Sequence, residues 1–190
     1  MAQAKTLTKD ELARVLDYID TRRFAQRNRA MMLLTHLAGL RIGEVACLRW
    51  SDVINTDGTV KEEIRLLPDM TKGRHARTVF VNIKLREELQ AYSAQAKCVD
   101  RSYPFFASQK SVKAGFSANS LAQTFALLYE GAGLEGASSH SGRRTFITRM
   151  AAQGVGVRVL AALAGHSSIQ VTQRYIDVND DMKRQAVELV

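Results

Sequence analysis

Apolar residues near the start of the chain recur at the three- and four-residue spacing of an amphipathic helix. This spacing predicts a helix over Lys9–Asp20. Thr8 and Glu11 have the form of a capping box, in which the two side chains satisfy free backbone donors at the start of a helix. The apolar face of the predicted helix consists of Leu12, Val15, Leu16 and Ile19.

The next apolar stretch shows no alternation with polar residues. It covers residues 30–38 and ends at Gly39, a residue that favours a left-handed helix cap, so we expect a buried helix here. A shorter helix is predicted over residues 43–48, before the pattern changes period. The first 48 residues are therefore expected to be mainly helical.

A hairpin is predicted in the middle of the chain, after the turn signal Asp57-Gly58. Residues 63–67 and 77–81 are β-branched or alternating, which is typical of strands. The polar residues 69–76 between them have the character of a hairpin loop. We therefore expect a small antiparallel sheet.

From residue 82 the sequence returns to helical spacing. Two longer helices are marked by apolar residues, Leu85, Leu89 and Tyr92 in one and Leu121, Phe125 and Leu128 in the other. Three short helices bounded by cap residues are then predicted over residues 141–153, 157–164 and 168–175. A final tail helix within residues 176–190 carries an apolar stripe that needs a surface to cover it, formed by Met182, Ala186 and Leu189.

The composition predicts one folded domain with a basic surface. The 190 residues include 46% hydrophobic and 24% charged residues, which is ordinary for a globular chain long enough to bury a core. Lys and Arg number 27 against 19 Asp and Glu, so the formal charge is +8. Nucleic acid is the first candidate partner, although many basic proteins bind none.

The cysteines and the N-terminus point to an intracellular protein. Cys47 and Cys98 have no partners at zinc-ligand spacing, so neither a disulfide framework nor a metal knuckle is indicated. The N-terminus has no apolar core of the signal-peptide type, and the apolar run over residues 30–34 is too short to span a bilayer. We expect a cytoplasmic protein with no membrane partner.

Residues suited to phosphate chemistry gather in five short motifs. Leu40-Arg41-Ile-Gly-Glu44 and Thr71-Lys72-Gly-Arg74 come first, followed by His140-Ser-Gly-Arg143, Gly165-His166 and Arg174-Tyr175. This order and spacing resemble those of the tyrosine recombinase or phage integrase family, over about residues 6–182. The resemblance implies a mainly helical α+β catalytic fold with a small three-stranded antiparallel sheet, and a site-specific recombinase that cleaves and rejoins DNA.

The residues themselves are consistent with that chemistry. Cleaving a phosphodiester requires a nucleophile, cations for the nonbridging oxygens and a proton for the leaving oxygen. Tyr175 offers a phenol, and Arg41 and Arg143 offer forked donors for phosphate oxygens. His140 and Arg143 lie three residues apart, on one side of a helix start where free backbone N–H groups also favour an anion.

The resemblance assigns a role to each motif residue. Tyr175 is expected to form a covalent 3′-phosphotyrosine, without metal or nucleotide cofactor. Lys72 is the expected general acid, His140 the general base and His166 a supporting hydrogen-bond donor. Glu44, one helical turn after Arg41, is expected to orient its surroundings, because a free carboxylate would repel the phosphate.

Two positions depart from the family pattern, and three basic residues could contact DNA. The family often has Leu and His around the second arginine, where this chain has Gly142 and Arg144; the glycine affects local packing. Arg144 is a candidate contact to the DNA backbone, with a solvated surface arginine as the equal alternative, and Arg74 and Arg77 are further candidate contacts.

Each residue taken singly has a simpler interpretation. Tyr175 fits a packing role beside Val171, the arginines fit ion pairs, and Lys72 fits a solvated loop. Only their joint occurrence in the family order favours catalysis. Outside the motifs, we expect His36 in the core, His75 on the loop surface, and core positions for the aromatic residues Trp50, Phe105 and Phe106.

The resemblance further implies a homo-tetramer on double-stranded DNA, free monomers in solution, and docking of the tail stripe on a neighbouring subunit. Residues 1–190 are expected to form a single catalytic domain without the N-terminal core-binding domain of the family, either as a fragment or as a single-domain recombinase similar to the fimbrial-switch inverters.

Three rival functions remain: a type IB topoisomerase, a non-cutting DNA-binding regulator and a metal-dependent nuclease.

Overall fold

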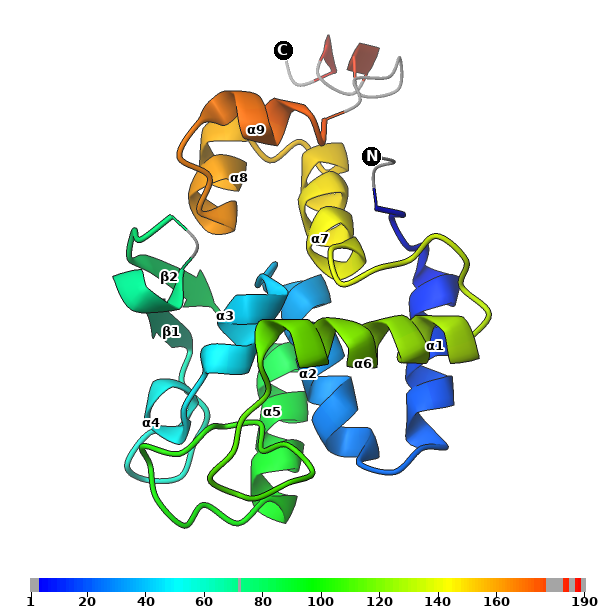
Figure 1. The fold of residues 1–190 in the computed structure, drawn as a ribbon. Helices are drawn as coiled ribbons and strands as arrows, with labels where there is room; N and C mark the ends of the chain where they lie inside the picture. Colours follow the sequence, from blue (N-terminus) through cyan, green and yellow to red (C-terminus); the bar gives the residue numbers. More distant parts are fainter. Residues whose placement is uncertain (1–3, 72, 177–182, 185–186, 189–190) are drawn as a thin grey trace.

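The computed structural model describes residues 4–71, 73–176, 183–184 and 187–188, and Figure 1 shows their arrangement. The first helix, α1 (Lys9–Asp20), has the predicted bounds because the capping box forms. The Glu11 N–H donates to Thr8 Oγ1 at 3.1 Å, and the Thr8 N–H donates to Glu11 Oε2 at 2.9 Å. The predicted apolar face of α1 is buried.

The central helix is α2 (Ala25–Leu37), which packs against α1, α5 (Ile83–Gln95) and α7 (Ser141–Ala152). It begins before the predicted residue 30 because its N-cap, Phe24, has a left-handed φ of 63° and makes no side-chain cap, so the sequence carries no start signal. It ends as predicted, since Gly39 has a φ of 65°.

Two short helices follow α2. The first, α3 (Ile42–Cys47), lies close to the predicted residues 43–48. The second, α4 (Trp50–Val53), was not predicted, because four residues are too few to show a helical period. It is started by Asp52, whose carboxylate accepts a hydrogen bond from the Arg49 N–H at 2.8 Å.

The sheet has two strands in the part of the chain that the structure describes, not the three expected. β1 (Glu63–Leu66) and β2 (Arg77–Phe80) pair antiparallel with Ile64 opposite Val79, and the 3₁₀ turn η1 (Pro68–Met70) lies in the hairpin loop. The segment before β1 makes a single bridge between Ile54 and Val60. The Asn55 N–H donates to Thr59 O at 2.8 Å and closes a tight turn. The residues that a third strand would need therefore form this turn instead.

The core continues below the sheet, around α5 and α6 (Ala118–Gly131). Trp50, Phe105 and Phe106 are buried, which confirms their prediction as core residues. Phe105 and Phe106 form an edge-to-face pair with ring centroids 4.8 Å apart, and the Tyr92 hydroxyl donates to Phe105 O at 3.0 Å. The mainly helical fold with one small antiparallel sheet is thus confirmed.

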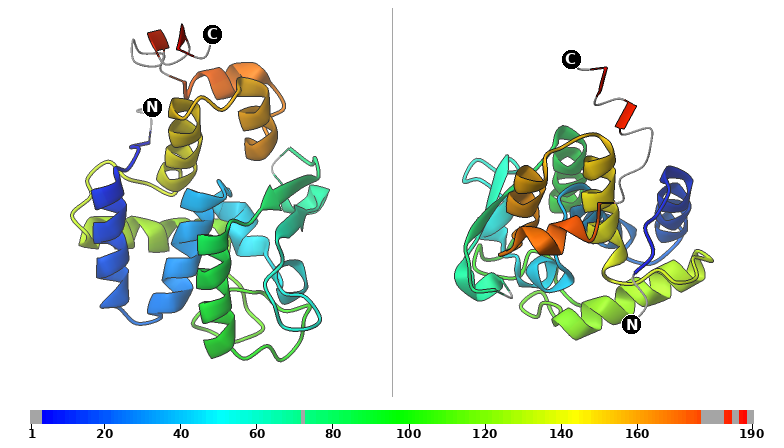
Figure 2. Two further views of the ribbon diagram at one scale, coloured as in Figure 1. Left: turned by 180° about the vertical axis from the view of Figure 1, so that it is seen from behind. Right: turned by 90° about the horizontal axis from the view of Figure 1, so that it is seen from above.

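Three helices lie together at one end of the molecule: α7, α8 (Val157–Ala164) and α9 (Ile169–Gln173) (Figure 2). α7 packs closely on α2 because Gly142 has no side chain. A Cβ at that position would lie 2.1 Å from Thr35 Oγ1 and 2.7 Å from His36 Nδ1. The departure from the family pattern at Gly142 therefore matches the close approach of Thr35 and His36 from α2.

The predicted tail stripe of Met182, Ala186 and Leu189 lies outside the described residues. Among the helices that the structure describes, none is long and apolar enough to cross a membrane.

Candidate active site

One cavity of about 420 Å³ is lined by side chains from the separate segments that carry the motifs. They include five of the six residues predicted to be catalytic: Arg41 at the start of α3, His140 and Arg143 at the start of α7, His166 between α8 and α9, and Tyr175 after α9. Arg144, one of the predicted DNA contacts, also lines it, together with Ala4 and Val171.

A second, larger cavity of about 870 Å³ adjoins the first, since Arg41, His166 and Val171 line both. Thr71 and Gly73, in the loop between β1 and β2, also line this larger cavity. Lys72, the predicted general acid, lies between them in the sequence but outside the described residues. The described neighbours bring the hairpin loop to the edge of the candidate site.

Arg143 is held by two backbone carbonyls from separate segments of the chain. Its side chain is buried, and Nη1 donates to Gly39 O at 2.7 Å while Nη2 donates to Ala164 O. Burial, and then the charge of nearby Arg41, lower the pKa of Arg143 from 12.5 to about 9. The guanidinium is still charged at neutral pH and is fixed before any ligand arrives.

Arg41 is anchored by Glu44, one turn further along α3. Its Nη1 donates to Glu44 Oε1 at 2.9 Å and its backbone N–H donates to Glu44 Oε2 at 2.7 Å. Nη2 donates to Gly165 O at 3.3 Å. Arg41 is partly exposed toward the cavity, so its guanidinium can also meet a ligand.

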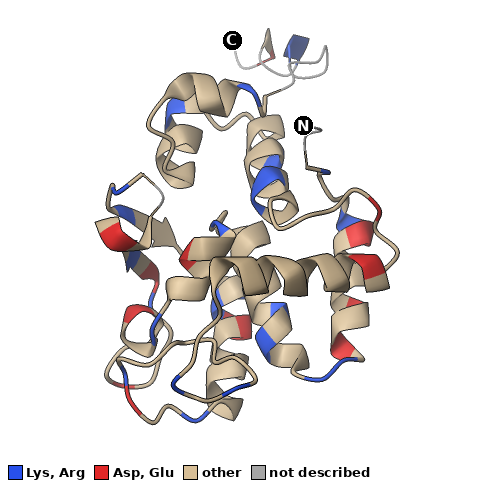
Figure 3. Cartoon of the chain, in the orientation of Figure 1, with Lys and Arg blue, Asp and Glu red and all other residues tan. Residues whose placement is uncertain are grey.

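Glu44 is a buried carboxylate between two arginines. Its side chain is 1% exposed, and Arg77 Nη2 on β2 donates to Oε2 at 2.7 Å. Burial by itself would raise the pKa of Glu44, but the charges and hydrogen bonds of Arg77 and Arg41 lower the pKa below its usual value. Figure 3 shows basic segments of β2 and α7 on either side of the acidic segment of α3.

His166 is oriented by Thr172 of α9. Its Nδ1 lies 2.8 Å from the Thr172 hydroxyl oxygen, and Thr172 is buried. Burial, followed by the charges of Arg143, Arg41 and Arg77, lowers the pKa of His166 to about 4. The imidazole is therefore neutral at physiological pH and can exchange hydrogen bonds with a ligand without adding charge.

The Tyr175 ring is packed between two motif segments. It stacks on the His166 ring with centroids 5.8 Å apart and an interplanar angle of 22°. The Arg144 guanidinium carbon lies 5.5 Å from the Tyr175 ring centroid on α7's side. His140, the N-cap of α7, is exposed and lines the same cavity, so its ring is accessible from solvent.

The family model described as the phage integrase family matches residues 5–182. The chain belongs to the phage integrase family. Its curated relatives include the tyrosine recombinase XerA of Thermococcus kodakarensis, 29% identical over 184 residues, and XerD of Rickettsia prowazekii, 28% identical over 197 residues. These alignments cover 97% and 95% of this chain, but 62% and 61% of the relatives. The integrase-family chain thus spans about three fifths of their length.

Solved structures share the fold of this integrase-family chain. The crystal structure of XerA recombinase matches with a TM-score of 0.77 and 22% identity, covering 100% of this chain and 66% of that one. The Tn1549 transposon integrase in complex with a circular intermediate DNA matches with a TM-score of 0.80 and 20% identity, covering 100% and 67%. At these identities the likeness concerns the fold alone.

Other predicted residues of the integrase-family chain lie at the edges of the site or in the core. Arg74 is exposed in the hairpin loop, with a left-handed φ of 52°. Arg77, predicted to contact DNA, has a side chain only 8% exposed, and its Nη2 bonds to the buried Glu44 carboxylate. His36 is buried and His75 exposed, which confirms both predictions.

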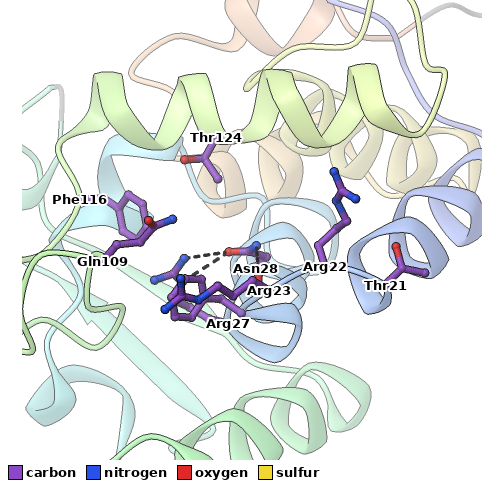
Figure 4. A pocket seen from close by; sticks show the side chains of 9 residues that line it. Thr21, Arg22, Arg23, Arg27, Asn28, Gln109, Phe116 and Thr124 are labelled. Carbon is purple, nitrogen blue, oxygen red and sulfur yellow. Dashed lines mark hydrogen bonds between the residues drawn. The ribbon is translucent and has the colours of Figure 1, made fainter.

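A separate cavity of about 370 Å³ lies away from the motifs, at the start of α2 (Figure 4). Arg22, Arg23 and Arg27 line it, and no motif residue does. Arg27 is occupied structurally: its Nη1 donates to Ala107 O at 2.8 Å, and its guanidinium lies over the Phe24 and Phe116 rings. The described residues contain no cluster of three His, Cys, Asp or Glu side chains that could hold a metal ion.

Proposed function

We propose that this chain is the catalytic domain of a site-specific DNA recombinase that cleaves and rejoins DNA through a covalent 3′-phosphotyrosine at Tyr175. The observation that carries the proposal is the cavity that brings the Tyr175 phenol together with the Arg41 and Arg143 guanidiniums and the neutral His166 imidazole. A phenol beside fixed cations is suited to attack a phosphodiester, because the cations stabilise both the phenolate and the charge that develops on phosphate oxygens.

The proposed cleavage step forms one bond and breaks one. Tyr175 Oη bonds to the scissile phosphorus as the bond from phosphorus to the 5′ oxygen breaks. The phenol proton passes to His140, and Lys72 gives a proton to the departing 5′ oxygen. Because a phosphodiester is replaced by a phosphotyrosine ester, the bond energy is kept, and a 5′-hydroxyl from another strand can reverse the step.

The remaining side chains of the cavity hold the phosphate. Arg41 and Arg143 would each direct forked donors at the nonbridging oxygens, and both guanidiniums are already fixed by backbone carbonyls. His166 would donate a third hydrogen bond from Nε2 when Thr172 donates to Nδ1. Such preorganisation lowers the barrier because little has to move when the charge develops.

Double-stranded DNA is the proposed substrate. The formal charge of +8 suits a polyanion, and the Tn1549 integrase and XerH recombinase structures that share the fold are complexes with DNA. Arg74 and Arg144 are proposed to contact the DNA backbone. Because recombination joins two duplexes, a tetramer on DNA is also proposed, with the stripe of Met182, Ala186 and Leu189 docking on a neighbouring subunit.

Capture of the covalent adduct tests the proposal. The purified protein is mixed with a pool of duplexes of randomised sequence, each carrying a nick beside the potential cleavage position, so that a short product strand diffuses away and traps the adduct. We expect protein-linked DNA on a denaturing gel with the wild type and none with Tyr175→Phe. Wild-type protein that binds the pool without forming an adduct would refute the proposal in favour of a non-cutting DNA-binding protein.

A further inference from the structure

Three arginines are held by three consecutive carbonyls at the end of α8. Leu163 O accepts from Arg77 Nη1 at 2.8 Å, Ala164 O accepts from Arg143 Nη2, and Gly165 O accepts from Arg41 Nη2 at 3.3 Å. The last carbonyls of a helix lack helical partners and carry partial negative charge, so they suit guanidinium donors. Two of these arginines face the candidate phosphate site, whereas Arg77 does not line that cavity.

The path of the Arg77 side chain is fitted to the turn that carries His166. A Cβ on Gly165 would lie 2.4 Å from Arg77 Cδ, and Gly165 has a left-handed φ of 61°. The glycine of the Gly-His motif therefore gives Arg77 room to cross the turn. Because Arg77 Nη1 also bonds to Leu163 O, the side chain fixes the end of α8 directly before His166.

Arg77 also neutralises Glu44, the buried carboxylate that anchors Arg41. Glu44 Oε2 lies 2.7 Å from Arg77 Nη2, and Glu44 Oε1 lies 2.9 Å from Arg41 Nη1. With Arg77 present, the carboxylate is shared between two cations, and Arg41 keeps charge available for an incoming phosphate. Without Arg77, Arg41 would be the remaining partner of a buried charge, and the carboxylate would oppose the phosphate.

We infer that Arg77 is a positioning residue for DNA cleavage, which neutralises Glu44 and fixes the end of α8 so that Arg41 and His166 can act on the scissile phosphate. This inference rests on the proposed recombinase function. Since Arg77 begins β2, directly after the loop that contains Lys72, it also joins the hairpin to the phosphate site through its bonds to Glu44 and Leu163. It replaces the expectation that Arg77 contacts DNA.

The test separates DNA affinity from the rate of cleavage. Arg77→Lys and Arg77→Met are compared with wild type on a nicked duplex recovered from the adduct capture. Fluorescence anisotropy measures the dissociation constant of each protein for this DNA. The single-turnover rate of adduct formation is measured at saturating protein. We expect the dissociation constant to change less than about threefold and the rate to fall about 10- to 100-fold in Arg77→Met, because small misplacements of phosphate-binding groups have large effects. Arg77→Lys keeps the charge but cannot bridge both acceptors, so an intermediate rate is expected.

Two further variants provide the controls. Arg65→Met removes an exposed arginine from the neighbouring strand β1, and both parameters should stay at wild-type values. In the double variant Arg77→Met/Glu44→Gln the carboxylate charge is gone while an oxygen acceptor for Arg41 remains. We expect its cleavage rate to exceed that of Arg77→Met at least about threefold, a rescue that a loss of DNA contact would not produce.

The outcomes distinguish this inference from the proposed function. If wild type forms no adduct, the recombinase function fails. Suppose that wild type forms the adduct and that thermal melting shows both Arg77 variants to be folded. If these variants then cleave at the wild-type rate, or lose only DNA affinity, Arg77 does not position the site. Should Arg77→Met not fold, a wild-type rate in folded Arg77→Lys without any change in its pH profile would equally refute the inference.

Discussion

The close packing of α7 on α2 at Gly142 predicts a sharp response to a single methyl group. In Gly142→Ala the new Cβ would lie 2.1 Å from Thr35 Oγ1, and the Thr35 hydroxyl cannot easily turn away because it donates to Met32 O at 2.7 Å. Ordinary contacts between heavy atoms are about 3.5 to 4.0 Å, so the two helices must move apart by roughly 1 Å or more at this point. The strain falls directly beside Arg143.

The expected cost follows from that overlap. Overpacking of a core contact typically costs about 1 to 3 kcal/mol, and the better helix propensity of alanine returns at most about 1 kcal/mol. We therefore expect Gly142→Ala to lose about 2 kcal/mol in the free energy of unfolding, which corresponds to a fall in Tm of about 4 to 8 °C for a chain of this size. Adduct formation should fall about 10-fold or more, because Arg143 would shift with the helix start.

Urea denaturation followed by circular dichroism measures this change, with Gly43→Ala as the matched control. Its Cβ would lie 3.6 Å from the Ala118 Cβ, an ordinary contact, so Gly43→Ala should be as stable as wild type or slightly more stable. In a double-mutant cycle with Thr35→Ala, the double variant should lose less stability than the sum of the single variants, by about 0.5 kcal/mol or more. A Gly142→Ala protein as stable as Gly43→Ala would refute the packing argument.

Three further predictions concern pH, salt and metal ions. Burial lowers the pKa of His36 from 6.5 to about 4, so the unfolded chain takes up this proton at a higher pH than the folded one. The contribution of neutral His36 to the free energy of unfolding is complete above pH 6.5 and is lost as the pH falls toward 4, by about 3 kcal/mol in total. The urea midpoint should therefore fall less steeply over this pH range in His36→Leu than in wild type. Arg74→Ala should weaken DNA binding at every sequence and reduce the slope of log affinity against log salt concentration by about one, as measured by anisotropy titrations, and an unchanged slope would exclude a phosphate contact. DNA cleavage should be the same in EDTA, since guanidiniums and a phenol carry the proposed chemistry, and its loss would favour the metal-dependent nuclease.

The elements with local signals could be predicted from the sequence. α1 has its predicted bounds because Thr8 and Glu11 specify its start within four residues. The start of α2 was predicted too late because its N-cap, Phe24, has a left-handed backbone conformation and makes no side-chain cap, so the sequence carries no start signal there. The third strand was expected from the family resemblance, whereas the turn at Asn55 and Thr59 leaves only one bridge there.

The candidate site likewise contains residues that the sequence could predict and residues that it could not. Five of the residues that line the cavity, Arg41, His140, Arg143, His166 and Tyr175, stand in short motifs, so their order along the chain was enough to nominate them. Arg77 was predicted only as a candidate DNA contact, because its partners, Glu44 and Leu163, are 33 and 86 positions away in the sequence. No local pattern contains that information. The need for a glycine at position 142 is likewise visible only in the structure, where Thr35 on another helix lies close to it.

Because three guanidiniums bind the carbonyls at the end of α8, the design of chimeric enzymes is constrained. An exchange of α8 and α9 between two homologous enzymes would import a new turn before the histidine at position 166 while leaving the residue at position 77 behind on the hairpin. A larger amino acid at position 165 in the donor segment would then collide with the resident arginine. Hybrid enzymes of this kind should be designed with both segments taken from the same parent.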